Sequence, residues 1–210
     1  MQLIDINKKF GDETIFENFS YDFQKGKITV VIGDSGVGKT TLLNIILGLT
    51  RYDGDVRKFG KMSCVFQNNN LIPTLTVKEN LELVCKDIDA LKELEKFEIL
   101  EAKDYYPSML SNGMAKRVEI IRALHFSSDI ILMDEPFSCL DYYMKYKVVD
   151  EIKKHNRKHK STIIIVTHDL KIVEALADRI LILKSLNKHV ELVNDGKNIE
   201  DDILKILVKK

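Results

Sequence analysis

The sequence predicts an α/β fold in which a mostly parallel sheet is flanked by helices, with an N-terminal antiparallel β subdomain and a short helical insert. Apolar runs of strand length alternate with helical segments between Ile28 and Leu49 and again after Ile130, as in parallel sheets covered on both faces. The segment before Phe23 instead alternates apolar and polar positions. A stretch rich in leucine and glutamate, with helical spacing, lies between these two parts.

The N-terminal segment is expected to form two half-buried antiparallel strands. Gln2–Asn7 and Glu17–Phe23 alternate apolar and polar residues, which is the period of a strand with one face in the core. Turn residues precede and follow the second strand, at Gly11-Asp12 and at Lys25-Gly26-Lys27. These features predict a small antiparallel subdomain ahead of the parallel sheet.

The next part of the chain changes from strand to helix patterns. An apolar strand, Ile28–Ile32, leads into an apolar and therefore buried helix from Thr40 to about Leu49, and a short strand, Met62–Phe66, follows. From Thr76 to about Ala102 aliphatic residues recur at helical spacing. Thr76 and Glu79 form the pattern of a capping box at the start of that run. The run predicts a small helical insert.

The last third of the chain alternates strands and helices again. The expected strands are Ile130–Met133, Thr162–Val166, Ile180–Leu183 and His189–Val193, and the expected helices are Gly113–Phe126, Tyr142–His159, Leu170–Ala177 and Ile199–Val208. Acidic residues 200–202 begin the final helix and Lys209-Lys210 follow its end, which suits the helix dipole. We expect one domain over residues 1–210, with a helical subdomain at about residues 68–126 inserted in it.

The composition is that of an ordinary globular domain. Hydrophobic residues make up 45% of the 210 residues, and 32 basic residues balance 32 acidic ones. Because there is no basic excess, we expect no nucleic-acid partner. No apolar run approaches the ~18–20 residues that span a bilayer, and no signal peptide is recognisable, so a cytoplasmic chain is expected. The distant cysteines Cys64, Cys85 and Cys139 predict neither a disulfide framework nor a zinc site.

Residues Gly33–Thr41 read GDSGVGKTT and fit the phosphate-binding P-loop pattern, with a strand before and a helix after. The glycines permit backbone angles that turn successive N–H groups inward around an anion. Lys39 can reach the β- and γ-phosphates of a nucleotide, and the Thr40 hydroxyl can ligate Mg²⁺. A glycine-rich turn that binds nothing is the weaker alternative, because strand, loop, lysine and hydroxyl are all in place. The core is therefore expected to be that of a P-loop NTPase.

Two acids follow the apolar strand that begins at Ile130. Asp134, at the strand tip, can hold Mg²⁺ directly or through water. Glu135 is placed beside it to polarise an attacking water. Solvated acids at a strand end would look the same, and the P-loop earlier in the chain favours the catalytic interpretation.

Further motifs give the chain its resemblance to a known family. Leu110–Met114 reads LSNGM and resembles the LSGGQ signature of ATP-binding cassette (ABC) proteins, and the following KRVEIIRAL continues the likeness. Gln67 matches the Q-loop glutamine, Ser138-Cys139-Leu140-Asp141 the D-loop, and His168 the switch histidine. Phe10 occupies the place of the aromatic residue that stacks on adenine. Each could singly be an ordinary loop or core residue, but in this order they resemble the nucleotide-binding subunit of an ABC transporter.

The resemblance implies that ATP is sandwiched between two such subunits arranged head to tail, with the P-loop of one facing the signature of the other. The residues it assigns to the nucleotide are Phe10, Gly33, Asp34, Ser35, Gly36, Val37, Gly38, Lys39, Thr40, Thr41, Ser111, Gly113 and Asp141. The residues it assigns to Mg²⁺ are Thr40, Gln67 and Asp134. The residues it assigns to catalysis are Glu135 as general base, His168 on the γ-phosphate, Gln67 as sensor of Mg²⁺ and water, and Lys39 on the phosphates.

The signature departs from the family pattern at two positions. Asn112 replaces a glycine, and it is expected to stand in because asparagine tolerates left-handed backbone angles. Met114 replaces a polar residue and cannot make its hydrogen bonds. ATP binding is expected to persist, and a heterodimer in which this signature completes a slow site stays open. The helical insert is also shorter than in most importers of this type.

The function expected from the resemblance is ATP hydrolysis that powers solute transport through an integral membrane permease, at the inner face of the cell membrane. Glu135-Pro136-Phe137 resembles importer more than exporter subunits, while the direction of transport, the solute and the choice between homodimer and heterodimer stay open. A soluble ABC ATPase in a non-transport complex is one alternative. A nucleotide-dependent dimerisation module with slow turnover is another.

Overall fold

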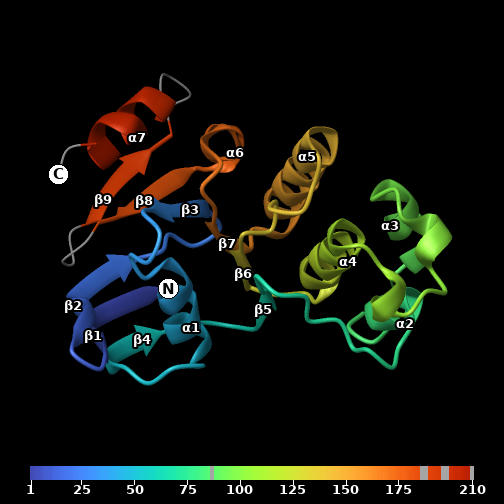
Figure 1. Ribbon diagram of the computed structural model, residues 1–210, viewed down its shortest axis with the longest axis horizontal. Helices are drawn as coiled ribbons and strands as arrows, with labels where there is room; N and C mark the ends of the chain where they lie inside the picture. Colours follow the sequence, from blue (N-terminus) through green and yellow to red (C-terminus); the bar gives the residue numbers. More distant parts are fainter. Residues whose placement is uncertain (86–87, 185–188, 195–198, 209–210) are drawn as a thin grey trace.

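A six-stranded sheet with strand order β5-β6-β7-β3-β8-β9 forms the centre of the molecule (Figure 1). The computed structural model describes residues 1–85, 88–184, 189–194 and 199–208. The strands are β3 (Ile28–Gly33), β5 (Met62–Val65), β6 (Ile130–Asp134), β7 (Thr162–Val166), β8 (Arg179–Leu183) and β9 (His189–Val193). All neighbours pair in parallel except β8 and β9. The mostly parallel sheet that the strand–helix alternation predicts is therefore confirmed.

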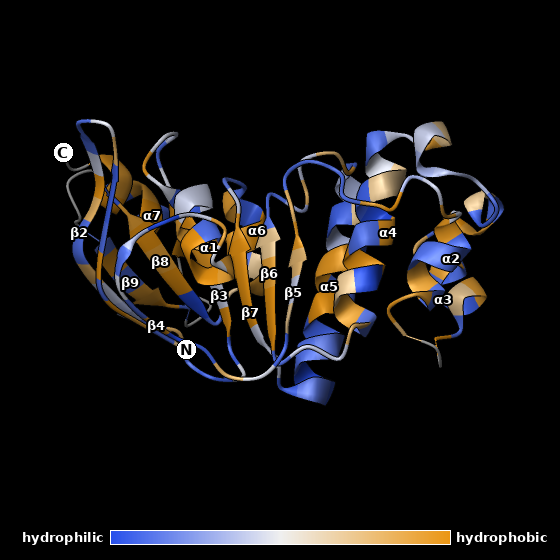
Figure 2. Ribbon diagram, turned by 90° about the horizontal axis from the view of Figure 1, so that it is seen from below, coloured by the Kyte–Doolittle hydropathy of each residue, from blue (hydrophilic) through white to orange (hydrophobic). Residues whose placement is uncertain are grey.

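Both faces of this sheet are buried, as the continuous apolar strands predict. Because successive side chains point to opposite faces of a strand, Ile130 and Leu132 join one apolar cluster, together with α1 (Lys39–Leu47). Ile131 and Met133 join a second cluster on the other face, which includes the later helices. Figure 2 shows the hydrophobic strands enclosed between helices whose outer faces are hydrophilic. The α1 helix buries four of its aliphatic side chains, in agreement with the expected buried helix.

The N-terminal sheet has three antiparallel strands in the order β2-β1-β4. Strands β1 (Gln2–Phe10) and β2 (Glu13–Asp22) confirm the two expected strands and are longer than the alternation indicated. Strand β4 (Asp53–Arg57) was not expected, because its sequence is polar apart from Val56. It forms through pairing with β1, and a Cβ at Gly54 would lie 2.5 Å from the Asp5 carbonyl oxygen. That close approach leaves room only for glycine.

The helical insert consists of short helices at one end of the molecule (Figure 1). It contains α2 (Val77–Glu82), α3 (Ala90–Lys96), 3₁₀ turns at Leu100–Ala102 and Pro107–Met109, and α4 (Asn112–His125). The Thr76 hydroxyl accepts from the Glu79 N–H at 3.3 Å and the Glu79 carboxylate accepts from the Thr76 N–H at 2.7 Å, which confirms the capping box. The subdomain boundary near residues 68–126, within one domain, stays a prediction.

The remaining helices match their expected ranges closely. These are α5 (Tyr142–His159), α6 (Leu170–Leu176) and α7 (Ile199–Val208), and the first turn of α7 contains the expected acids. The expected Lys209 and Lys210 lie outside the described residues. The three cysteines are free. In the described part of the chain, no helix is both long enough and apolar enough to cross a bilayer.

Candidate active site

Functional side chains gather at the carboxyl ends of β3 and β6, because parallel strands end at the same edge of the sheet. Strand β7 lies between them and pairs with both. A cavity of about 290 Å³ opens there. It is lined by Ser35, Gly36, Gly38, Lys39, Thr40, Thr41, Gln67, Asp134, Glu135 and Val166. The P-loop, Gln67 and the two acids that the sequence singles out are thus brought together.

The loop from β3 to α1 has the glycine-dependent shape that the sequence predicts. Gly33, Gly36 and Gly38 all have positive φ angles, of 150°, 81° and 104°. A Cβ at Gly33 would lie 2.4 Å from the Leu183 carbonyl oxygen, and one at Gly38 would lie 2.6 Å from Ile15 Cγ2. The loop is therefore packed so closely against β8 and β2 that side chains at these two positions would displace it.

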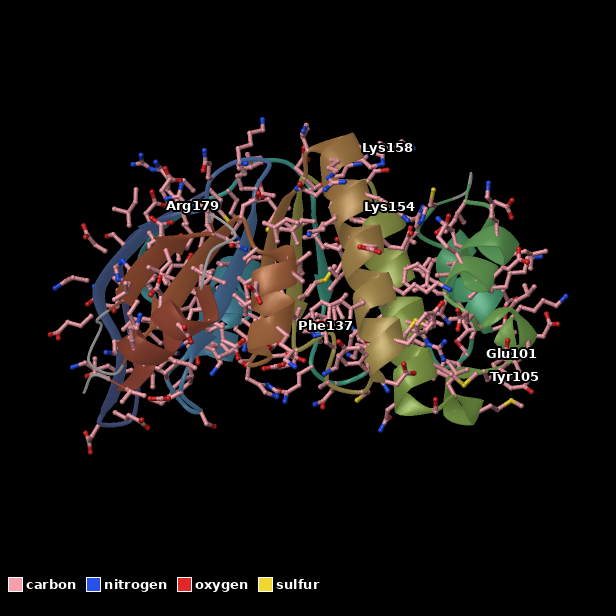
Figure 3. The ribbon with its side chains drawn as sticks, turned by 90° about the horizontal axis from the view of Figure 1, so that it is seen from above. Glu101, Tyr105, Phe137, Lys154, Lys158 and Arg179 are labelled. Carbon is pink, nitrogen blue, oxygen red and sulfur yellow. The ribbon has the colours of Figure 1, made fainter. Side chains whose placement is uncertain are left out.

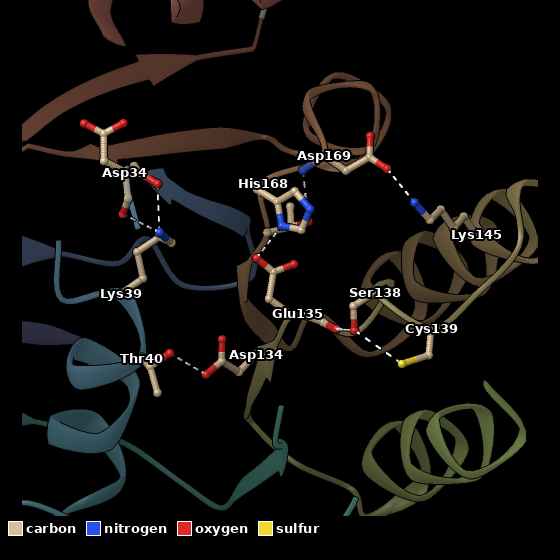
Figure 4. Close-up of polar contacts among 12 residues, drawn as sticks. Asp34, Lys39, Thr40, Asp134, Glu135, Ser138, Cys139, Lys145, His168 and Asp169 are labelled. Atoms are coloured by element: carbon tan, nitrogen blue, oxygen red, sulfur yellow. Dashed lines mark hydrogen bonds and ion pairs between the residues drawn. The ribbon is translucent and has the colours of Figure 1, made fainter. Parts of the chain in front are cut away.

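Lys39, the first residue of α1, lies across this loop (Figure 4). Its Nζ donates hydrogen bonds to the carbonyl oxygens of Gly33 at 2.7 Å and Asp34 at 2.8 Å. Burial lowers the pKa of Lys39 from its usual value, and the nearby charges of Glu135, Asp34 and Asp134 oppose that shift. A phosphate oxygen entering the loop would offer this ammonium a charged acceptor in place of the neutral carbonyls.

Thr40 and Asp134 form a hydrogen-bonded pair in the lining of the cavity. The Thr40 hydroxyl donates to Asp134 Oδ2 at 2.8 Å (Figure 4). Burial raises the pKa of Asp134, although the hydrogen bond from Thr40 favours the charged form. Hard oxygen ligands of this kind suit Mg²⁺, which usually takes few protein ligands and completes its shell with phosphate oxygens and water. No group of three or more His, Cys, Asp or Glu that could hold a metal occurs among the described residues.

Glu135 and His168 meet at the cavity rim (Figure 4). His168 Nδ1 lies 2.9 Å from Glu135 Oε1, at hydrogen-bond distance. Glu135 has a positive φ of 47°, which is uncommon for a residue with a Cβ. Its N–H donates to the Val166 carbonyl, and its carbonyl accepts from the Ser138 hydroxyl. The chain therefore turns sharply after β6 and directs the Glu135 carboxylate to the cavity, where its side chain is 15% exposed.

The signature and D-loop residues do not line this cavity. The Ser111 hydroxyl accepts from the Met114 N–H at 3.2 Å and caps α4, and the Asp141 carboxylate accepts from the Met144 N–H at 2.9 Å and caps α5. A Cβ at Gly113 would lie 2.7 Å from the Cys139 carbonyl oxygen, so the start of α4 packs against the D-loop. The predicted contact of these residues with a nucleotide across a subunit interface stays a prediction.

The expectation for Asn112 was wrong. Asn112 is the first residue of α4 and is absent from the residues with positive φ, so no left-handed angle is needed there. Its Oδ1 accepts from the Asn69 side chain at 3.4 Å. Met114 is partly buried and packs against the core cluster, which explains how an apolar residue is tolerated at the last position of the signature. The helix start is therefore regular despite both departures.

Phe10 lies at the end of β1, 52% exposed, and does not line the cavity. The ammonium of Lys8 lies 4.2 Å from the centre of its ring. The adjoining strand β2 contributes Ile15 and Phe16, which approach Gly38 of the loop. The predicted stacking of Phe10 on adenine stays a prediction.

Two further polar pairs near the site were missed. Lys145 on α5 donates to Asp169 Oδ2 at 2.8 Å, and Asp169 follows His168 (Figure 4). Lys116 and Glu119 on α4 form an ion pair with side chains only 1% and 2% exposed. The spacing of Lys116 and Glu119, three residues apart among apolar neighbours, is the sequence signal that would have revealed the second pair.

The fold and this cavity define a nucleotide-binding ATPase of the P-loop class. The family described as ABC transporter matches residues 16–138, more than half of the chain. The Fe(3+) ions import ATP-binding protein FbpC of Fusobacterium nucleatum is 35% identical over 84% of this chain and 53% of its own length. The aliphatic sulfonates import ATP-binding protein SsuB of Bacillus cereus is 34% identical over 91% of this chain and 82% of its own length.

A solved structure agrees with these relatives. The dimeric, post-hydrolysis structure of an ATP-binding cassette bound to ADP and Pi has a TM-score of 0.79 and 30% identity, covering 93% of this chain and 99% of that one. The chain belongs to the ABC transporter family. It is an ABC ATPase, and its length corresponds to about half of the iron-import relative and to most of the sulfonate-import relative.

Proposed function

We propose that this ABC ATPase hydrolyses Mg²⁺-ATP to drive solute import through a partner membrane permease. The observation that carries the proposal is one cavity of about 290 Å³ that unites the phosphate-binding loop, the Thr40–Asp134 pair and the Glu135 carboxylate. Phosphate binding, metal binding and water activation each have a residue of the right chemistry there. No other described cavity combines these three.

The nucleotide is bound first through its phosphates. The N–H groups of the glycine loop and the N-terminus of α1 favour an anion in the cavity. Lys39 releases the carbonyls of Gly33 and Asp34 and pairs with the β- and γ-phosphates. The exposed ring of Phe10 stacks on adenine. Thr40, Asp134 and Gln67 would hold Mg²⁺, which would supply positive charge to stabilise the phosphates during hydrolysis.

Hydrolysis then needs a water in line with the bond to the γ-phosphate. Glu135 accepts a proton from that water as its oxygen attacks the γ-phosphorus, and the bond to the β-phosphate oxygen breaks to leave ADP. His168, hydrogen-bonded to Glu135, holds the γ-phosphate and positions the carboxylate. Gln67 orients the water. The catalytic effect comes from position and from stabilised charge.

A second ATP-binding subunit is needed to complete the site. Ser111 and the Gly113 N–H, at the positive end of the fourteen-residue helix α4, would contact the γ-phosphate bound by the partner. Asp141 of the D-loop would join the two sites. The relative solved with ADP and Pi is a dimer, which supports this arrangement.

The permease partner places the chain at the cytoplasmic face of the membrane. Relatives with import names for iron, sulfonates and spermidine/putrescine support an importer over an exporter. The test is co-expression with a polytopic permease encoded beside it. We expect a stoichiometric complex whose phosphate release rises when the transported solute is supplied. Phosphate release that no membrane partner alters would instead favour a soluble ABC ATPase.

Replacing Asp134 by Asn is expected to weaken the response to Mg²⁺. The variant keeps an oxygen to accept the Thr40 hydrogen bond but loses the charge that attracts the cation. The Mg²⁺ concentration for half-maximal hydrolysis should rise at least about tenfold, since each 1.4 kcal/mol of lost binding is a factor of ten. Steady-state phosphate release over a Mg²⁺ titration measures it. Asp150→Asn, exposed on α5, is the control, and an unchanged titration curve for Asp134→Asn would remove this residue from the metal site.

A further inference from the structure

A buried ion pair on α4 is attached to the backbone of the segment that carries Gln67. Lys116 Nζ lies 2.8 Å from Glu119 Oε2, and both side chains are almost completely excluded from solvent. Ser111 caps the start of the same helix, and the pair lies about one to two turns further along it. The ion pair thus connects the helix that follows Ser111 with the segment that carries Gln67.

Besides binding each other, Lys116 and Glu119 both form hydrogen bonds to the backbone of residues 66–70. Lys116 Nζ donates to the Phe66 carbonyl at 2.6 Å and to the Gln67 carbonyl at 3.3 Å. The Glu119 Oε1 atom accepts the N–H of Asn70. The ammonium has three protons, and its three acceptors are therefore Glu119 and the two carbonyls.

A third side chain on the same helix face adds to this attachment. Arg122 Nη2 donates to the Asn70 carbonyl at 2.5 Å. Residues 116, 119 and 122 follow one another at intervals of three, so they lie on neighbouring turns of one helix surface. Together they hold both ends of the short segment that begins with Phe66 and ends with Asn70.

Fold stability gives little reason for such a pair. Removing two charges from water costs several kcal/mol each, and apolar residues of similar volume are often as stabilising or more so. The other buried residues of α4 are all apolar, so apolar residues at positions 116 and 119 would match them. What an apolar pair could not do is hold the Phe66, Gln67 and Asn70 backbone groups in fixed places.

We propose that Lys116 and Glu119 are positioning residues. They hold the backbone at Gln67 so that its side chain reaches the proposed Mg²⁺ site, and they make Gln67 move together with α4. Gln67 lines the same cavity as Thr40 and Asp134. A second subunit that engages Ser111 moves α4, and the ion pair carries that movement to Gln67. This inference rests on the proposed role of Gln67 in the reaction.

The test is a mutant cycle between the ion pair and Gln67. The double variant Lys116→Met with Glu119→Leu removes the attachment without leaving a buried charge. We expect its melting temperature to be no lower than that of the unsubstituted protein, its KM for ATP to change little, and its kcat to fall on the order of 10- to 100-fold. Adding Gln67→Ala should cause no further loss, because residues that act through one another are not additive.

The matched control is Lys154→Met. Lys154 also pairs with a glutamate three residues away, Glu151, at 2.7 Å, but its side chain is 68% exposed on α5 (Figure 3). Its loss should leave kcat unchanged. A wild-type kcat in the ion-pair variant, or a loss that multiplies with that of Gln67→Ala, would overturn the proposal.

Two further measurements keep the proposal testable if the double variant folds poorly or if hydrolysis is absent. Arg122→Met removes one hydrogen bond without creating a buried charge, and it should lower kcat to a smaller extent, again without adding to Gln67→Ala. Amide hydrogen exchange at Asn70 should be slow in the unsubstituted protein and fast in the ion-pair variant. Equal exchange in both proteins would overturn the positioning role, whereas an unsubstituted protein that hydrolyses no ATP would count only against the proposed function.

Discussion

Replacing Glu135 by Gln is expected to slow ATP hydrolysis by about 10²- to 10⁴-fold, the usual contribution of a general base. The amide keeps the size of the side chain and can still contact His168, but it cannot take a proton from water. ATP affinity should stay close to that of the unsubstituted protein, because Lys39 and the loop backbone are untouched. Phosphate release and nucleotide titration, measured on the same preparation, separate the two effects.

The same variant reports on the subunit arrangement. If hydrolysis separates the subunits, Glu135→Gln should run as an ATP-dependent dimer on size exclusion, while Asp150→Asn and the unsubstituted protein return to the smaller species. Equally long-lived dimers of the unsubstituted protein would favour a slow dimerisation module. Rapid hydrolysis by the variant would assign the proton transfer to another residue.

Replacing Lys39 by Ala is expected to lower ATP affinity by at least about 100-fold, since hydrogen bonds to charged groups contribute about 1.5–3 kcal/mol each. The ammonium already sits inside the loop, bound to the Gly33 and Asp34 carbonyls, so it needs only a short movement to meet a phosphate. Calorimetric titration with a non-hydrolysable ATP analogue measures the change. Hydrolysis should be lost in parallel.

A matched lysine shows whether that loss is specific. Lys154→Ala removes an ammonium whose side chain is 68% exposed on α5, and it should bind ATP as the unsubstituted protein does. Thermal unfolding of both variants checks that each is folded. Unchanged ATP affinity in Lys39→Ala would end the assignment of this loop to phosphate binding.

Much of the fold could be predicted because its strong signals are local. Four consecutive apolar residues in each of β6 and β7 predict buried strands, and α5 begins and ends at the predicted residues. Strand β4 could not be predicted, since four of its five residues are polar or glycine and its stability comes from pairing with β1. An edge strand of this kind has no periodicity of its own.

The candidate site divides in the same way. Gly33, Lys39 and Asp134 could be found from motifs because their chemistry depends on spacing along the chain. Lys116 and Glu119 escaped because their partners are backbone atoms of Phe66, Gln67 and Asn70, about fifty residues away in the sequence. The backbone at Asn112 was misjudged because the glycine that it replaces in the family motif was taken to require a left-handed angle. The helix was expected to begin at Gly113, but it begins at Asn112, which therefore has helical angles.

At Glu135, the residue that the proposed hydrolysis needs is not the residue that would make the fold most stable. A side chain held at a positive φ costs of the order of 1–3 kcal/mol relative to a residue that adopts such angles freely. Drift toward glycine or asparagine would therefore make the polypeptide more durable while removing its proton acceptor. Screens that select only for heat resistance would tend to enrich inactive forms at this position.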